Sequence, residues 1–273
     1  MSIHKPAKTR AMTIHDFHGR KVNGLKLSMV TCYDYCSASI LNESQVDCIL
    51  VGDSGSMVMH GCPTTLGATV DMIVQHTLAV AKGAPDKFIV GDLPFCSYRK
   101  SRARTIEAVE RIMRAGAQAV KLEGAAGNLK TVRHIVESGV PVMGHIGLTP
   151  QSVHGLGGFK VQGRVPEVAT RLMREAHELA EAGCFALVLE CVPADLAQEI
   201  TVSLSIPTIG IGAGPHTTGQ VLVWHDLLGM SQSFKPKFLK TFLNGFELVR
   251  DALNAFDGEV KQTTYPDLKE HCY

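Results

Sequence analysis

The chain has 273 residues, of which 45% are hydrophobic, so it is long enough to form one large domain around a single core. Lys and Arg number 27 against 26 Asp and Glu, which leaves no net field to attract nucleic acid or an anionic membrane surface. No stretch approaches the roughly 20 consecutive apolar residues of a membrane span. We therefore expect a protein that acts on a small molecule, with no nucleic-acid or membrane partner.

The N-terminal stretch and the cysteines bear on the compartment. Residues 1–17 contain basic side chains but lack the apolar core of a secretory signal. Eight cysteines are present without a C-x-x-C pair, and those in or beside apolar runs are expected to be buried like small hydrophobic residues. They are Cys32, Cys48, Cys62, Cys96, Cys184 and Cys191. We expect a reducing, cytoplasmic location and no structural zinc.

Eight apolar, β-branched runs bounded by Gly, Asp or Pro recur along the chain, and each predicts a strand. In chain order they span residues 28–34, 48–53, 88–94, 119–124, 141–147, 185–192, 207–214 and 221–226. Segments with helical periodicity lie between most of them, most clearly at 71–84, 104–117, 128–139 and 166–184.

Alternating strands and helices predict a parallel sheet covered by helices, and eight strands are the number that closes a barrel. We predict an α/β fold, a (β/α)8 TIM barrel. A single domain is expected over residues 1–273, with a short N-terminal extension and a C-terminal helical tail. A doubly wound open sheet is the competing architecture.

Three Gly-rich or long connections stand out. Residues 54–61 follow Asp53 with small residues that we expect to form neither strand nor helix and to leave space for a ligand. Residues 148–165 are too long and Gly-rich for a plain connection and predict an active-site lid. Residues 210–220 resemble a phosphate-binding turn, although such glycines also serve tight turns.

Polar side chains gather at the carboxyl ends of the predicted strands and are almost absent within them. Those ends form one rim of a barrel, so we expect the side chains to converge on one mouth. Because side chains alternate along a strand, Lys121 and Glu123 share the inward face, and Glu190 points inward by the same count. The full set is Asp34, Asp53, Asp92, Lys121, Glu123, His145 and Glu190.

This set has a structural and a chemical interpretation. Strand-end carboxylates can cap the following helices, and Lys121 with Glu123 can form a structural ion pair. Several carboxylates buried together, however, are costly without a cation, which favours a divalent metal. The hard oxygens of Asp53, Asp92 and Glu123 favour Mg²⁺, while His145 keeps Zn²⁺ as an alternative.

A metal with open positions beside a lysine would favour enolate chemistry. A 2-oxo acid can chelate Mg²⁺ through its carboxylate and carbonyl oxygens, and Lys121 would add positive charge. The remaining carboxylate, Glu190, could then remove a proton from the carbon beside that carbonyl.

Seven sequence blocks, in order along the chain, resemble ketopantoate hydroxymethyltransferase, a family also called 3-methyl-2-oxobutanoate hydroxymethyltransferase. The blocks are "VGDS" at 51–54, "DLPF" at 92–95, "MRAGAQAVKLEG" at 113–124, "GHIGLTPQSV" at 144–153, "KVQGR" at 160–164, "LVLECVP" at 187–193 and "IGIGAGP" at 209–215. The resemblance extends over nearly the whole chain.

The resemblance implies a (β/α)8 barrel that transfers a hydroxymethyl one-carbon unit from 5,10-methylenetetrahydrofolate to 3-methyl-2-oxobutanoate. The implied product is 2-dehydropantoate, in pantothenate and coenzyme A biosynthesis, formed through a Mg-stabilised enolate. The resemblance also implies a homo-oligomer, usually a decamer of two rings of five.

Carried over position by position, the resemblance also assigns roles to residues of this chain. The implied Mg²⁺ ligands are Asp53, Asp92 and Glu123. The implied keto-acid contacts are Asp53, Ser54, Asp92 and Lys121, with His145 near the substrate. The implied proton acceptor is Glu190.

Two segments depart from the family pattern. The family usually has Leu-Gly-Met where this chain has Gly55-Ser56-Met57, and often has Asp in place of Thr218. Two other functions stay open from sequence: a Mg²⁺-dependent carbon–carbon lyase acting on 2-oxo acids, and a non-catalytic barrel. A requirement for folate separates the transferase from the lyase, and turnover separates both from the non-catalytic barrel.

Overall fold

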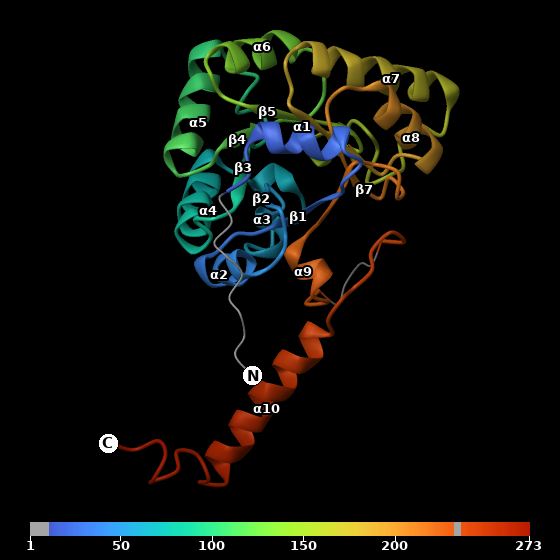
Figure 1. Cartoon of the computed structure of the whole chain (residues 1–273). Helices are drawn as coiled ribbons and strands as arrows, with labels where there is room; N and C mark the ends of the chain where they lie inside the picture. The colour runs from blue at the N-terminus through green and yellow to red at the C-terminus, as the bar shows by residue number, and fades with distance from the viewer. Residues whose placement is uncertain (1–10, 232–235) are drawn as a thin grey trace. The chain divides into compact units, whose positions relative to one another are not determined.

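The computed structural model describes residues 11–231 and 236–273. Eight parallel strands follow one another around a closed barrel, in which the eighth pairs with the first (Figure 1). The strands are β1 (Leu27–Thr31), β2 (Cys48–Val51), β3 (Phe88–Asp92), β4 (Ala119–Lys121), β5 (Val142–Gly147), β6 (Ala186–Glu190), β7 (Thr208–Ile211) and β8 (Gly219–Leu222). The predicted (β/α)8 barrel is confirmed, and the closing pair excludes an open sheet.

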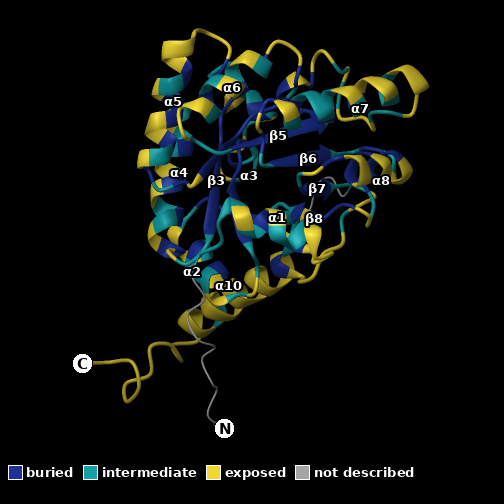
Figure 2. Ribbon diagram, turned by 45° about the horizontal axis from the view of Figure 1, so that its top comes forward, coloured by how far each residue is buried: buried dark blue, intermediate teal, exposed yellow. Residues whose placement is uncertain are grey.

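Helices surround the barrel, one before the first strand and the others between consecutive strands, with their buried faces inward and their exposed faces outward (Figure 2). They are α1 (Ile14–Val22), α2 (Tyr35–Glu43), α3 (Gly55–Val58), α4 (Val70–Gly83), α5 (Arg102–Arg114), α6 (Leu129–Glu137), α7 (Pro166–Glu181) and α8 (Ala194–Ser203). Short 3₁₀ turns occur at Thr65–Gly67 and Pro150–Ser152. The four clearest helical segments of the sequence correspond to α4, α5, α6 and α7.

Helix α5 shows how the sequence specifies this outer layer. The side chain of Ser101 caps its first turn by accepting a hydrogen bond from the backbone N–H of Arg104. Its buried residues include Thr105, Ala108 and Ile112, which recur at helical spacing. One stripe of the helix therefore packs on the barrel while the rest meets water.

The amino-terminal end of the barrel is filled. Phe17 of α1 is fully buried, with its ring centroid 5.1 Å from that of Phe88 and 5.4 Å from that of Phe185, which lie at the starts of β3 and β6. Inward side chains such as Met29 and Val188 continue this core along the barrel axis. A ligand site is therefore left to the opposite, carboxyl end.

The structure corrects three sequence expectations. The last strand was expected at 221–226, but β8 spans Gly219–Leu222 and a helix, α9, begins at Trp224. Residues 54–61 were expected to be non-helical, but α3 begins at Gly55. Half of the cysteines expected to be buried are only partly so; these are Cys62, Cys96 and Cys191.

The chain divides into two compact units, Met1–Val223 and Trp224–Tyr273. The first holds the barrel, and the second contains α9 (Trp224–Leu227) and α10 (Gly245–Lys261). A single domain over residues 1–273 stays a prediction. The absence of a secretory signal also stays a prediction, because residues 1–10 lie outside the described residues.

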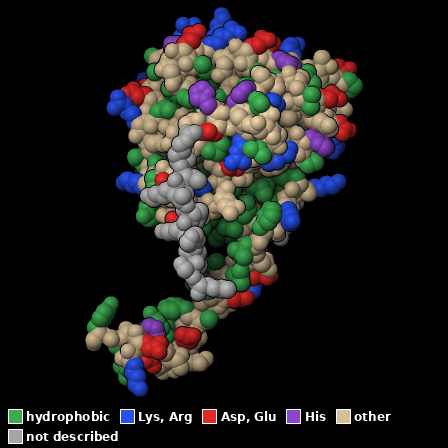
Figure 3. Space-filling view, viewed as in Figure 1, with side chains coloured by type: hydrophobic (Ala, Val, Ile, Leu, Met, Phe, Trp, Pro, Cys, Tyr) green, Lys and Arg blue, Asp and Glu red, His purple; other side chains and the backbone are tan. Residues whose placement is uncertain are grey.

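The surface agrees with the balanced charge of the sequence. Basic and acidic side chains are interspersed over the helices at the top of the view in Figure 3. Of the helices within residues 11–231 and 236–273, none combines the length and apolar content needed to cross a membrane.

Candidate active site

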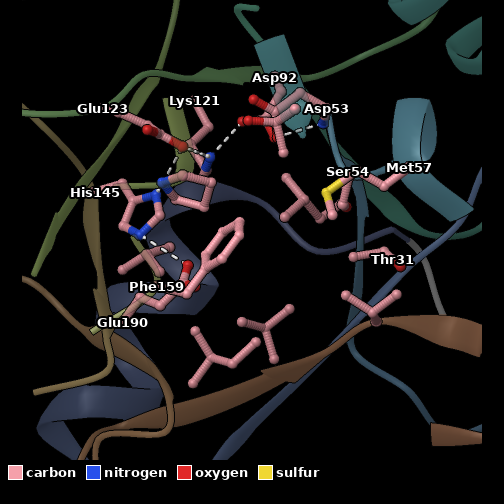
Figure 4. A pocket seen from close by; sticks show the side chains of 17 residues that line it. Thr31, Asp53, Ser54, Met57, Asp92, Lys121, Glu123, His145, Phe159 and Glu190 are labelled. Carbon is pink, nitrogen blue, oxygen red and sulfur yellow. Dashed lines mark hydrogen bonds and ion pairs between the residues drawn. The ribbon is translucent and has the colours of Figure 1, made fainter. Parts of the chain in front are cut away.

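A cavity of about 180 Å³ opens at the carboxyl ends of the strands, and the ionisable groups expected there line it (Figure 4). The predicted site residues on its wall are Asp53, Ser54, Asp92, Lys121, Glu123, His145 and Glu190. The alternation argument holds, because Val120 and Leu122 are buried outside the cavity wall. Asp34 was expected at the mouth, but it caps α2 by accepting a hydrogen bond from the backbone N–H of Ser37.

Lys121 is the buried cation of the site. Its Nζ donates to Oδ1 of Asp92 at 2.5 Å and lies 4.0 Å from Oε1 of Glu123. Burial alone would lower the pKa of Lys121, but the charges of Asp92, Glu123 and Asp53 outweigh it and raise the pKa. The side chain is therefore a fixed ammonium rather than an amine nucleophile at neutral pH.

Asp53 is the least compensated carboxylate. Burial, followed by the nearby charges of Asp92 and Glu123, raises its pKa well above the usual value. Its backbone N–H donates to Oδ2 of Asp92 at 3.0 Å, and its Oδ2 accepts from Nε2 of Gln151 at 2.8 Å. A further cation beside Asp53 would stabilise the ionised form.

His145 lies between two carboxylates from the neighbouring strand ends. Its Nδ1 is 3.5 Å from Oε1 of Glu123, and its Nε2 is 3.2 Å from Oε2 of Glu190. Burial and Lys121 lower the pKa of His145, but the two glutamates outweigh them and raise it to about 9. Burial would raise the pKa of Glu123, but His145, Lys121 and the Gln151 backbone lower it.

Ser54 and the residues after it pack against Tyr33. The Tyr33 hydroxyl and the Ser54 Oγ are 2.8 Å apart. A Cβ atom on Gly55 would lie 2.7 Å from Cδ1 of Tyr33. The absence of a side chain at position 55 thus makes room for the Tyr33 ring, not for a ligand, which corrects the expected role of this residue.

The loop after β5 runs over the cavity, as expected of a lid, although its movement stays a prediction. The backbone N–H of Leu148 donates to the carbonyl of Glu190 at 2.8 Å, and that of Gln162 donates to the carbonyl of Cys191 at 2.8 Å. Between these two anchors, Phe159 is 52% exposed and lines the cavity.

Sequence reasoning missed Gln151 and Tyr98, which hold the carboxylates from outside the strands. The backbone N–H of Gln151 donates to Oε2 of Glu123 at 3.0 Å, and Tyr98 donates to Oε1 of Gln151 at 2.8 Å. Neither is charged or at a strand end, so the strand-end pattern could not find them. Gln151 does lie within the block 144–153 that carried the family resemblance.

The donor set suits a hard divalent cation in its chemistry. Three carboxylates converge beside the cavity, and burial, followed by the nearby charges of Asp92 and Glu123, raises the pKa of Asp53. Yet among residues 11–231 and 236–273, no three His, Cys, Asp or Glu side chains are already arranged to hold a metal ion.

The model of the ketopantoate hydroxymethyltransferase family matches residues 11–268 of this chain. A 3-methyl-2-oxobutanoate hydroxymethyltransferase of Coxiella burnetii (strain CbuG_Q212) is 63% identical over 264 residues, which cover 96% of this chain and 99% of the relative. The chain belongs to the ketopantoate hydroxymethyltransferase family. A 3-methyl-2-oxobutanoate hydroxymethyltransferase of Bdellovibrio bacteriovorus is 58% identical over 258 residues, which cover 94% of this chain and 98% of the relative.

The ketopantoate hydroxymethyltransferase fold extends to more distant enzymes. A phosphonopyruvate hydrolase solved with oxalate and Mg²⁺ superimposes with a TM-score of 0.61 at 11% identity, covering 95% of this chain and 90% of that chain. At this identity the similarity shows the barrel fold alone. Membership in an enzyme family, rather than this likeness, argues against a non-catalytic barrel.

Proposed function

We propose that this chain transfers a hydroxymethyl group from 5,10-methylenetetrahydrofolate to 3-methyl-2-oxobutanoate, giving 2-dehydropantoate for pantothenate synthesis. The observation that carries the proposal is the buried cluster at the barrel mouth, in a chain 63% identical to a 3-methyl-2-oxobutanoate hydroxymethyltransferase. The cluster combines a fixed ammonium, a carboxylate base and hard-oxygen ligands in one small cavity.

Glu190 takes the role of base in this proposal. It lies at the end of β6 on the cavity wall, and His145 holds its Oε2 at 3.2 Å. The side chain removes the C3 proton of the keto acid, and the electron pair of that C–H bond moves toward the 2-oxo oxygen. The imidazolium of His145 keeps the carboxylate in place between proton transfers.

Lys121 and Ser54 bind the keto acid. The ammonium balances the negative charge that develops on the oxygens of the substrate, and the hydroxyl of Ser54 offers a hydrogen bond at the cavity wall. Phe159 and the loop that carries it limit the access of water from above.

In the proposed transfer, C3 forms a bond to the methylene carbon, and both bonds between that carbon and the folate nitrogens break. Water supplies the hydroxyl group of the product. The remaining proton of water and the proton taken from C3 go to the two nitrogens of tetrahydrofolate, so atoms and charge balance.

Asp53, Asp92 and Glu123 would hold Mg²⁺ in the proposed enzyme. The ion would supply Lewis-acid polarisation of the 2-oxo carbonyl and a chelation point for the keto acid. The hard-oxygen donors on the cavity wall, and the burial of Asp53 beside Asp92 and Glu123, support this assignment.

The proposed enzyme is cytoplasmic and forms a homo-oligomer. All eight cysteines are free, in agreement with a reducing compartment. Large apolar side chains on α10, among them Leu253 and Phe256, are more than half exposed within this single chain, which supports burial against further copies. Sedimentation velocity is expected to show the decamer implied by the family.

The test is product formation with defined substrates. Purified protein with Mg²⁺ and both substrates is expected to give 2-dehydropantoate by mass spectrometry, and omission of the folate should abolish it. A 2-oxo acid lyase would cleave its substrate without folate. Cleavage without folate, or no turnover with both substrates, contradicts the proposal.

A further inference from the structure

Gln151 occupies an unusual position for an uncharged side chain. It is 5% exposed and lies in the 3₁₀ turn Pro150–Ser152, at the start of the loop over the cavity. Through its backbone N–H it binds Glu123, and through its amide it binds Asp53. One residue thus connects two carboxylates that come from the ends of β2 and β4.

The direction of the amide is fixed by its neighbours. Its Nε2 faces the carboxylate of Asp53 at 2.8 Å and the carbonyl of Leu93 at 3.0 Å, which are both acceptors. Its Oε1 accepts from the hydroxyl of Tyr98 at 2.8 Å. A flipped amide would place its oxygen against the two acceptors, the Asp53 carboxylate and the Leu93 carbonyl. The Tyr98 hydroxyl, which also donates to the carbonyl of Glu123 at 3.3 Å, supports the observed direction without deciding it.

These contacts use one oxygen of each carboxylate. Gln151 binds Oδ2 of Asp53 and Oε2 of Glu123, whereas Oε1 of Glu123 faces Lys121 and His145. Each carboxylate is therefore restrained in rotation, and Gln151 leaves its other oxygen free of amide contacts. Tyr98, which is 4% exposed, in turn restrains the amide.

We propose that Gln151 is a positioning residue that orients Asp53 and Glu123 for a divalent cation, and that Tyr98 acts through it. The inference rests on the metal site of the proposed function. Hydrogen-bonded partners of metal ligands typically change metal affinity by about 10- to 100-fold when they are removed. Because Gln151 also begins the loop after β5, it ties the geometry of the carboxylates to the segment that covers the cavity.

The experiment measures Mn²⁺ binding to the full chain without substrates, by electron paramagnetic resonance of the free ion. Gln151→Met keeps much of the side-chain volume and removes both amide contacts. Tyr98→Phe keeps the amide and removes its restraint. Ser152→Ala is the matched control, because Ser152 is an exposed neighbour in the same turn. Thermal unfolding of each variant is recorded in parallel.

We expect the Mn²⁺ dissociation constant to rise about 10-fold or more in Gln151→Met and about fivefold in Tyr98→Phe, with Ser152→Ala near wild type. A structural role alone would lower the unfolding temperature and leave the dissociation constant unchanged. Wild-type affinity in folded Gln151→Met overturns this inference and leaves the proposed metal site unaffected. If Gln151→Met does not fold, wild-type affinity in Tyr98→Phe overturns it. A wild-type chain that binds no Mn²⁺ overturns the inference together with the proposed metal site.

Discussion

Nε2 of His145 lies 3.2 Å from Oε2 of Glu190, on strands β5 and β6, which are neighbours in the barrel. The same two strands meet again in the backbone, where the N–H of Leu148 donates to the carbonyl of Glu190. Glu190 is thus held at both its side chain and its main chain by residues at the end of β5. The proposed base is positioned by its neighbouring strand, so changes there should affect catalysis.

Gly147→Ala tests that dependence. Gly147 has φ of +94°, and an added Cβ would lie 2.3 Å from the carbonyl oxygen of Glu190. We expect a loss of about 3 kcal/mol of unfolding free energy and a fall in kcat of about tenfold or more, because the backbone of Glu190 must move. Chemical denaturation and steady-state kinetics measure the two effects.

Gly139→Ala is the matched control. Gly139 has a similar φ of +86°, but no atom lies within 4 Å of the added Cβ. It should lose only about 1 kcal/mol from backbone strain and retain its kcat. Equal effects in the two variants would show that the contact with Glu190 has no role.

Removal of divalent metal should abolish transfer activity, and Mg²⁺ should restore it, because three buried carboxylates converge and their oxygens are the donors that Mg²⁺ prefers. Asp92→Asn should raise the Mg²⁺ concentration needed for half-maximal activity. Asp71→Asn, an exposed position on α4, serves as the control. Full activity in excess chelator would contradict a metal requirement.

Lys121→Met should weaken keto-acid binding and slow turnover, each by about tenfold or more, because the ammonium balances charge on the substrate. Steady-state kinetics with Lys130→Met, an exposed lysine on α6, provide the comparison. Borohydride with 3-methyl-2-oxobutanoate should trap no adduct. A covalent adduct at Lys121 would assign it a Schiff-base role and reject charge balance as its function.

Much of the barrel could be predicted from sequence because strand and helix periodicities are local. Alternation along a strand correctly placed Lys121 and Glu123 inside and Val120 outside. The strand-end pattern was wrong for Asp34, since a strand-end carboxylate can equally cap the next helix, and the choice depends on where the chain turns. The expected role of Gly55 was also wrong, because its small size makes room for the ring of Tyr33, a contact between distant positions.

The partners of the site residues could not be predicted from the sequence, because they too are contacts between distant positions. Gln151 reaches Asp53 across 98 positions and Glu123 across 28. No local pattern records such a contact, and an uncharged amide gives no signal of its own. The roles of the metal ligands and the base were inferred from the chemistry of the strand-end residues and are also implied by the family resemblance, and they stay predictions.

The central claim is that Glu190 removes the C3 proton of the keto acid. Proton NMR in deuterated water, with Mg²⁺ and 3-methyl-2-oxobutanoate but no folate, measures this step apart from one-carbon transfer. The wild type should exchange the C3 proton. Glu190→Gln should still bind the keto acid, but its exchange rate should be lower by about 10²-fold or more. Comparable exchange in folded wild type and Glu190→Gln would contradict the claim.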